Sequence, residues 1–85
     1  MKMSGNTMLI TGGGSGIGRG LAEAFHRLGN DVIITGRNQK ALDETTAANP
    51  GMRSALLDVT DPHSIQSFAA RAPEDYPSLN VLLNN

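Results

Sequence analysis

Residues 11–18 read TGGGSGIG, and this stretch decides the fold. Five of its eight residues are glycine, and it follows the apolar run MLI at residues 8–10. Glycine loses more backbone entropy on folding than any other residue, so such a run indicates a backbone that needs positive φ or a close approach. A glycine-rich turn that opens a helix presents free N–H groups and the positive end of the helix dipole, which attract phosphate. The alternative is a tight strand-to-helix turn that binds nothing.

Outward from the glycines, short apolar runs alternate with longer amphipathic stretches. The short runs predict buried strands at 6–11, 31–35, 53–59 and 79–85. Three helices are expected between them: one from Gly16, one at 38–49, and one that follows Asp61 and stops at a loop marked by Pro73 and Pro77.

Local signals support these helices. The first has an apolar face made by Ile17, Leu21, Ala24, Phe25 and Leu28. Gly29 is expected to end it in the left-handed conformation, whereas Asn38 is expected to cap the second helix. In the third helix, Asp61 is the expected N-cap, Pro62 occupies the first turn, and the apolar positions are Ile65, Phe68, Ala69 and Ala72.

The order βαβαβαβ predicts an α/β fold with a parallel sheet between two helix layers. Right-handed crossovers favour the strand order 3-2-1-4 in a doubly wound, Rossmann-like sheet. Ligands of such sheets bind outside the carboxyl ends of the strands, where the strand order reverses. The glycine run lies at that point.

The spacing of the glycines narrows the choice of phosphate motif. The pattern GxGxxG occurs in no register of residues 12–23, and the P-loop pattern fails because Arg19 and Gly20 replace its lysine and hydroxyl residue. The pattern that fits is TGxxxGxG, with Thr11, Gly12, Gly16 and Gly18.

On these residues, together with TGRN at 35–38, LLDVTD at 56–61 and LLNN at 82–85, the chain resembles the short-chain dehydrogenase/reductase family. The resemblance covers nearly the whole chain. It implies that residues 1–85 are the N-terminal part of a dinucleotide-binding Rossmann domain, truncated before the catalytic part. It also implies a parent oxidoreductase that transfers hydride between a nicotinamide cofactor and a carbonyl or alcohol substrate.

The resemblance assigns cofactor contacts to residues of the glycine run and of the later strand ends. Gly12, Gly16 and Gly18 resemble the dinucleotide glycines, Asp58 and Val59 the pair at the adenine ring, and Asn84 the asparagine that borders the cofactor. Thr11 would tie the first strand to the fourth through Asn84. The full set of expected contacts is Gly12, Gly14, Ser15, Gly16, Ile17, Gly18, Arg37, Asn38, Asp58, Val59 and Asn84. For Asp58 the alternative is an ordinary solvated strand end.

The end of the second strand predicts the choice of cofactor. An acidic residue there accepts hydrogen bonds from the ribose of NAD, but here Gly36 is followed by Arg37. Arginine pairs with a 2′-phosphate through charge-assisted, bidentate hydrogen bonds. We therefore expect NADP(H) to be preferred over NAD(H), although Arg37 could also be a plain solvated charge.

The residues that would catalyse hydride transfer are not expected in this chain. The family's catalytic tyrosine is followed four residues later by lysine, whereas Tyr76 is followed by Asn80. Neither His26 nor His63 has a partner at metal-ligand spacing, so no metal site is expected. We expect the 85 residues to be inactive alone. The alternatives are a nucleotide-binding module without catalysis and a self-associating structural fragment.

Composition sets the remaining expectations. The net charge is −1 and no basic stripe occurs, which argues against nucleic acid as a partner. No cysteine occurs, no apolar run is long enough to span a membrane, and no signal peptide is evident, so a cytoplasmic protein is expected. The strand at 79–85 would be an exposed apolar edge, and we expect the chain to associate with itself there.

Overall fold

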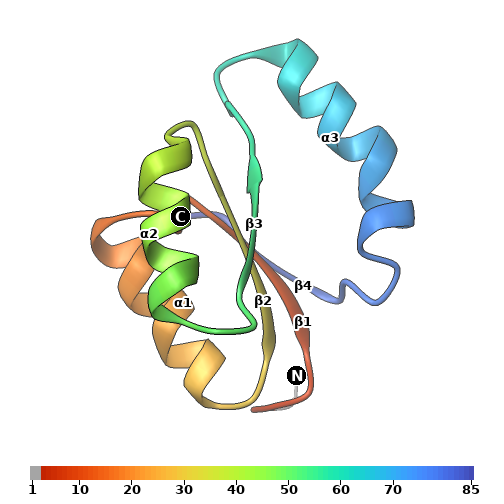
Figure 1. Ribbon diagram of the computed structural model, residues 1–85. Coiled ribbons are helices and arrows are strands. Elements are labelled where there is room, and N and C mark those ends of the chain that lie inside the picture. The colour runs from red at the N-terminus through yellow and green to blue at the C-terminus, as the bar shows by residue number, and fades with distance from the viewer. Residues whose placement is uncertain (1–2) are drawn as a thin grey trace.

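Strands and helices alternate along the whole of the described chain, residues 3–85, in the computed structural model (Figure 1). Their order is β1 (Thr7–Thr11), α1 (Gly16–Arg27), β2 (Asp31–Gly36), α2 (Gln39–Ala48), β3 (Arg53–Leu56), α3 (Pro62–Asp75) and β4 (Val81–Leu83). The βαβαβαβ order expected from the sequence is confirmed.

Within the described residues the strands form a single parallel sheet in the order β3-β2-β1-β4. The register of β1 and β2 runs from the pair Thr7–Asp31 to the pair Thr11–Thr35. On its other side β1 pairs with β4, where Leu9 lies opposite Leu82. The predicted strand order is therefore confirmed, and the order reverses between β1 and β4.

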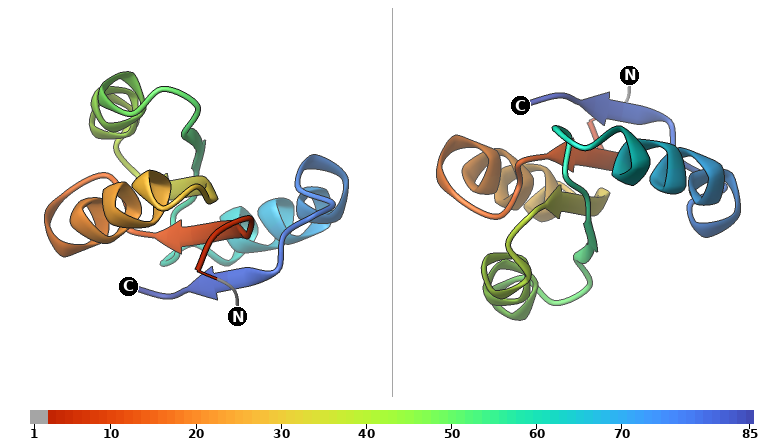
Figure 2. Two further views of the ribbon diagram at one scale, coloured as in Figure 1. Left: turned by 90° about the horizontal axis from the view of Figure 1, so that it is seen from below. Right: turned by 90° about the horizontal axis from the view of Figure 1, so that it is seen from above.

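The sheet separates the helices into two layers. Helices α1 and α2 lie on one side of the sheet and α3 lies on the other (Figures 1 and 2). This is the doubly wound arrangement, in which each crossover places its helix on a face of the sheet.

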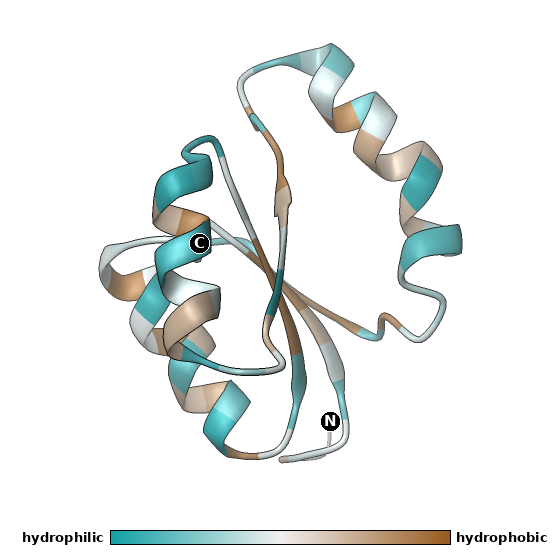
Figure 3. Cartoon of the chain, in the orientation of Figure 1, coloured by the Kyte–Doolittle hydropathy of each residue, from teal (hydrophilic) through white to brown (hydrophobic). Residues whose placement is uncertain are grey.

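The main hydrophobic core lies between the sheet and the layer of α1 and α2. Its buried members are Ile10, Ala22, Val32, Ile34, Leu42 and Met52. Strand β1 is buried along its whole length, and the apolar residues of β2 are buried as well. Figure 3 shows the corresponding concentration of hydrophobic residues in the middle of the sheet. Strands that are apolar on both faces are typical of a parallel sheet covered by helices.

Helix α1 does not bury the apolar face that its sequence predicts. Ile17 is 79% exposed and Leu28 is 45% exposed, whereas Gly18 and Ala22 are buried and Phe25 is partly buried against the core. The helix thus approaches the sheet with its small residues, because a small side chain allows a closer approach. The larger aliphatic side chains are left at the surface.

The expected end of α1 and the expected N-caps of α2 and α3 are confirmed. Gly29 follows α1 with φ at +92°, in the left-handed region. Asn38 caps α2 by accepting a hydrogen bond from the backbone N–H of Ala41 at 3.2 Å. Asp61 caps α3 by accepting one from the N–H of His63 at 3.0 Å, and Pro62 follows in the first turn.

Two predicted strands are shorter in the structure. β3 ends at Leu56 rather than at residue 59, because the Leu57 N–H makes a last bond to the Gly36 carbonyl at 2.9 Å and the Asp58 N–H then turns to the Ser64 hydroxyl. β4 covers only Val81–Leu83 of the predicted 79–85. At both ends of β4, hydrogen bonds of side chains extend its pairing with β1. They involve the Asn80 side chain at the start of the strand and the Thr11 hydroxyl at its end.

The prediction that Pro73 marks a loop is wrong, since α3 continues through it to Asp75. The last turn is held by contacts within the helix and by one residue outside it, Arg53. The Tyr76 N–H donates to the Ala72 carbonyl at 2.7 Å, and the Tyr76 ring lies 6.1 Å from the ring of Phe68 and beneath the guanidinium of Arg53. These contacts offset the backbone hydrogen bond that proline cannot make.

Candidate functional site

A cavity of about 320 Å³ opens at the carboxyl ends of the strands, where the strand order reverses. The segments that follow β1, β2, β3 and β4 all contribute to its wall. The lining residues are Thr11, Gly12, Gly14, Ser15, Thr35, Gly36, Arg37, Asn38, Ala41, Leu42, Leu57, Val59, Asn84 and Asn85. Its size falls in the range of small-molecule sites, which is about 300–1,000 Å³.

The glycine loop between β1 and α1 forms one wall of this cavity. Gly12 and Gly16 have φ of +68° and +59°, so the turn uses the left-handed region at both residues. The N–H groups of Gly12 and Gly13 donate to the Thr35 carbonyl at 2.8 and 3.2 Å, which fixes the start of the loop against β2. A side chain at Gly18 would collide with the Gly12 carbonyl, so that glycine permits α1 to begin directly against the turn.

The structure also explains the two glycines to which the motif assigns no role. Gly13 is buried, and a Cβ there would lie 2.6 Å from Cβ of Ile34, so the core leaves no room for a side chain. Gly14 differs, because a Cβ there would lie 3.5 Å from the Ala41 side chain, at ordinary contact distance. Gly13 is therefore required for packing and Gly14 is not.

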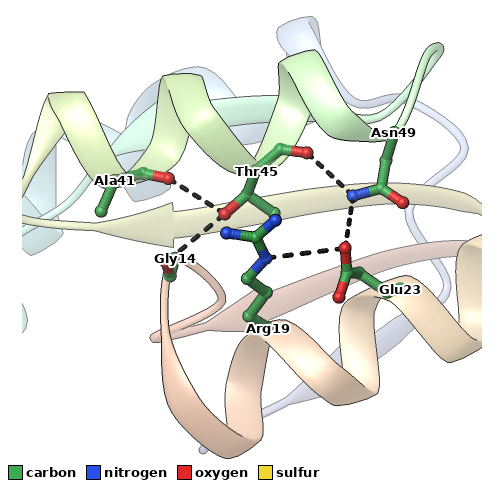
Figure 4. Close-up of polar contacts among 6 residues, drawn as sticks. All are labelled: Gly14, Arg19, Glu23, Ala41, Thr45 and Asn49. Atoms are coloured by element: carbon green, nitrogen blue, oxygen red, sulfur yellow. Dashed lines mark hydrogen bonds and ion pairs between the residues drawn. The ribbon is translucent and has the colours of Figure 1, made fainter.

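Polar side chains brace the loop and α1 against α2 (Figure 4). The buried Thr45 hydroxyl lies 3.0 Å from the Ala41 carbonyl and 3.4 Å from the Gly14 carbonyl, within hydrogen-bonding distance of both. Further along the helices, the Asn49 amide donates to Glu23 at 2.8 Å. That hydrogen bond, together with the positive charge of Arg19, lowers the pKa of the Glu23 carboxyl.

The end of β2 supplies a positive charge to the cavity. Arg37 lines the cavity, is exposed, and makes no hydrogen bond or ion pair with any residue in 3–85. Next to it the Asn38 side chain is occupied as the cap of α2. An unpaired guanidinium in a cavity wall is available to an anionic ligand.

Thr35, also at the end of β2, was not predicted from the sequence. It is 1% exposed and lines the cavity, and its hydroxyl has no hydrogen-bond partner among the described residues. A buried polar atom without a partner is uncommon in native proteins. The sequence holds no signal for it, because a threonine at a strand end usually finds a backbone partner.

The loop after β3 carries the residues expected at the adenine ring. Val59 lines the cavity and is 57% exposed. The Asp58 carboxylate accepts hydrogen bonds from the Thr60 hydroxyl at 2.6 Å and the Thr60 N–H at 2.9 Å. These bonds, with the charge of Arg37, lower the pKa of Asp58.

β4 enters the site through its last residues. The Thr11 hydroxyl donates to the Asn84 side chain at 3.0 Å and accepts from the Asn85 N–H at 3.0 Å. Thr11 therefore ties β1 to β4 through Asn84, as the resemblance implied.

The structure brings most of the expected contact residues to one cavity. Those that line it are Gly12, Gly14, Ser15, Arg37, Asn38, Val59 and Asn84. Those outside the lining are Gly16, Ile17, Gly18 and Asp58. Sequence reasoning missed the lining residues Thr35, Ala41, Leu42 and Leu57, which sit inside predicted strands and helices and resemble ordinary core residues.

Two further features are absent from residues 3–85. No group of three or more His, Asp or Glu side chains in this range could hold a metal ion. No helix in the same range has the length and apolar character needed to cross a membrane.

Comparison with known proteins points to one family. The family model described as short chain dehydrogenase matches residues 6–85. The chain is 45% identical over its full length to an uncharacterized oxidoreductase, DltE, of Bacillus subtilis, and 41% identical to a sorbitol dehydrogenase of Cereibacter sphaeroides. In both cases it covers 34% of the relative.

Solved structures give the same result. A short chain dehydrogenase from Bacillus anthracis is 33% identical, with a TM-score of 0.84 over 98% of this chain and 35% of the other. A second structure, described as a short chain dehydrogenase/reductase family protein, is 37% identical, with a TM-score of 0.85 over 100% of this chain and 35% of the other. The chain thus spans about a third of the length of the proteins it matches.

Proposed function

The chain belongs to the short-chain dehydrogenase family, and from that premise we propose that residues 1–85 are the cofactor-binding part of an NADP(H)-dependent oxidoreductase. The parent enzyme would transfer hydride between NADP(H) and a carbonyl or alcohol substrate. The observation that carries the choice of NADP(H) is Arg37, whose guanidinium lies in the cavity wall with no partner in residues 3–85. It follows the end of β2, the position where NAD sites carry an acid.

The lining of the cavity fits such a cofactor. The glycine loop presents backbone to the cavity at the N-terminus of α1, where the helix dipole favours a pyrophosphate. Gly16 lies outside the lining and faces open space, because a Cβ there would meet no described atom within 4 Å beyond its own chain neighbours and helix backbone.

We assign the expected residues to parts of the cofactor accordingly. Gly12, Gly14, Ser15, Gly16, Ile17 and Gly18 would form the pyrophosphate turn. Arg37 and Asn38 would hold the 2′-phosphate, and Asp58 and Val59 would face the adenine. Asn84 would border the cofactor at the end of β4. The Asp58 carboxylate keeps acceptor capacity for an adenine amine, because Thr60 bonds only to its Oδ1 atom.

When bound, the cofactor supplies the hydride, and protonation of the substrate oxygen requires an acid. Tyr76 does not fit that role, since it packs on Phe68 under Arg53 and Asn80 takes the place of the family's lysine. We therefore propose that these residues bind cofactor in a cytoplasmic protein without catalysing its reaction. That Tyr76 does not fit the role of the acid also favours a second candidate function, a nucleotide-binding module that works without catalysis.

Titration of the purified chain with NADPH and NADH tests the proposal. We expect saturable binding, tighter for NADPH. Arg37→Asp should weaken NADPH by at least about tenfold, because a charge-assisted hydrogen bond contributes about 1.5–3 kcal/mol, and should invert the preference. Arg71→Asp, the same charge change on α3, is the matched control and should change neither affinity. An unchanged NADPH/NADH ratio in Arg37→Asp would overturn the assignment.

We also propose that two copies of the chain pair through β4. This strand lies at an edge of the sheet, and Leu82 on it is 63% exposed. An exposed apolar edge strand readily accepts a strand of another chain. Sedimentation should show mass that rises with concentration, and Leu82→Lys should reduce it. Leu56→Lys, which changes a 53% exposed leucine on the opposite edge, should not. A monomer at every concentration would contradict the proposal.

A further inference from the structure

Asparagine side chains join the amino ends of three neighbouring strands, at the end of the sheet away from the cavity. Asn6 precedes β1, Asn30 precedes β2 and Asn80 precedes β4. We call this set the asparagine clamp. Asn6 is 2% exposed and Asn30 is 5% exposed, so these two are shielded from water, whereas Asn80 is exposed.

Asn80 connects the start of β4 to β1 through both its backbone and its side chain. Its side-chain oxygen accepts from the Thr7 N–H at 2.8 Å, and its own N–H donates to the Thr7 carbonyl at 3.0 Å. The Asn80 side-chain amide therefore takes the place of a backbone carbonyl in the ladder. Its NH₂ group donates to the Asn6 side chain at 3.1 Å.

Asn6 and Asn30 anchor that contact in the body of the sheet. The Asn30 side-chain oxygen accepts from the Asn6 backbone N–H at 3.1 Å and from the Asn6 side chain at 3.0 Å. The Asn30 NH₂ group donates to the Phe25 carbonyl at 2.9 Å, near the end of α1. The clamp thus links β4 to β1, to β2 and to the last turn of α1.

β4 needs such an anchor more than its neighbours do. It is three residues long, lies at an edge, and is apolar at each position, VLL. Register is normally specified by the contrast between a buried and an exposed face, and a uniform apolar run lacks that contrast. Hydrogen bonds at the two ends of β4 can fix its register instead.

The carboxyl end of β4 is where its register matters. There Asn84 and the Asn85 N–H meet the Thr11 hydroxyl, and both asparagines line the cavity. The Asn85 side-chain amide also lies 3.2 Å from the position of a Cβ on Gly12. A slip of β4 by one residue would replace Asn84 with a leucine or remove Asn85 from Thr11.

We propose that the asparagine clamp sets the register of β4 and thereby positions Asn84 and Asn85 beside the glycine loop. Asn80 is its positioning residue, although it lies at the opposite end of the strand from the cavity. For the effect on cofactor binding, the inference rests on the proposed function above.

The test compares Asn80→Ala with Asn80→Asp in two measurements. Hydrogen exchange of the Asn85 and Thr7 amides reports the register without any cofactor, and titration with NADPH reports the site. Asn80→Ala should lose about tenfold of the protection at both amides and a similar factor in NADPH affinity, since it removes two hydrogen bonds. Asn80→Asp keeps the acceptor for Thr7 but places a carboxylate oxygen opposite the Asn6 side-chain oxygen, where Asn80 has its NH₂ group. Because the bond to the Thr7 N–H remains, this variant should lose less of both than Asn80→Ala.

Two controls separate positioning from general stability. Ile33→Val removes one methylene from the buried part of β2 and lowers stability without touching β4. Ser78→Ala changes an exposed residue two positions before Asn80. Neither should reduce NADPH affinity or selectively expose the Asn85 amide. If Asn80→Ala does not fold, the partial loss in Asn80→Asp decides the question against the same controls.

The inference is overturned if the Asn80 variants keep wild-type protection at Asn85, or lose no more of it than Ile33→Val. It is also overturned if the register changes while NADPH affinity does not. If the wild-type chain fails to bind NADPH at all, the proposed function fails, and the exchange measurement still tests the clamp.

Discussion

The two faces of the sheet differ in how completely helices cover them. Under α1 and α2 the sheet and helix residues form a continuous buried core. Of the described residues on the other face, none in α3 is fully buried, and Ile65 on that helix is 44% exposed. Both layers have amphipathic helices in their sequences, so amphipathicity alone does not determine burial.

The difference lies in how closely each helix approaches the sheet. α1 presents Gly18 and Ala22, and its N-terminus is held by a loop that itself bonds to β2. α3 follows a loop that has already left the sheet after Leu57. The contact with the sheet is made just after the helix, where the Tyr76 ring lies under the Arg53 guanidinium of β3. The glycine loop therefore has two effects: it shapes the cavity, and it holds α1 close to the sheet.

The largest expected effect comes from the core under α1 and α2. Ile34 is fully buried and belongs to that core, so Ile34→Ala should cost about 2–5 kcal/mol through lost transfer energy and a cavity. Ile65→Ala on α3 should cost well under half as much, because the side chain is already 44% exposed. Chemical denaturation measures both, and equal costs would erase the contrast between the two faces.

The next effect tests the close approach of α1. Gly18→Ala should destabilise by about 1–3 kcal/mol, because its Cβ would press on the Gly12 carbonyl and push the helix from the turn. Gly20→Ala on the same helix is the control. No described atom lies within 4 Å of its Cβ, so it should stabilise by about 0.5–1 kcal/mol. If both variants changed the stability in the same direction, the contact between residue 18 and the Gly12 carbonyl would not be what requires glycine at that position.

The smallest effect is a pH dependence in the brace between α1 and α2. The hydrogen bond from Asn49 lowers the pKa of Glu23 in the folded chain. The stability gained from this bond is therefore fully present above the ordinary glutamate value of 4.5 and is lost as the pH falls through the lower folded value. In Glu23→Gln the denaturation midpoint should fall less steeply with pH in this window, while Asp58 continues to contribute. If the midpoint depends on pH in the same way in the wild-type chain and in Glu23→Gln, Glu23 does not stabilise the contact between α1 and α2.

Much of this architecture could be predicted from the sequence because its signals are local. The glycine spacing, the cap residues Asn38 and Asp61, and the apolar strand runs each act through neighbouring residues, and the order and topology follow from them. The exposed face of α1 could not be predicted, since periodicity marks an apolar stripe without showing what covers it. The passage of α3 through Pro73 was missed for a related reason: Tyr76 contacts Phe68 of the same helix and Arg53 of β3, and these contacts offset the local cost of the proline.

The residues of the candidate site also fall into a group that the sequence predicted and a group that it missed. Arg37 and the glycines were predicted because their types carry chemistry at a motif position. Thr35, Leu57 and the asparagine clamp were missed, since threonine, leucine and asparagine at strand ends are common. Only the fold shows that the Thr35 hydroxyl lacks a partner among the described residues and that the Asn6 and Asn80 side chains meet.

The most direct test of the account is a titration of the isotope-labelled chain with NADPH, followed amide by amide in two-dimensional NMR spectra. We expect saturable shifts in the glycine loop at 12–18 and at Arg37, Asn38, Val59 and Asn84, with the amides of α3 beyond its first turn unchanged. The contradicting result is the absence of saturable shifts, or shifts that are largest around Phe68 and Tyr76 on the far face of the sheet.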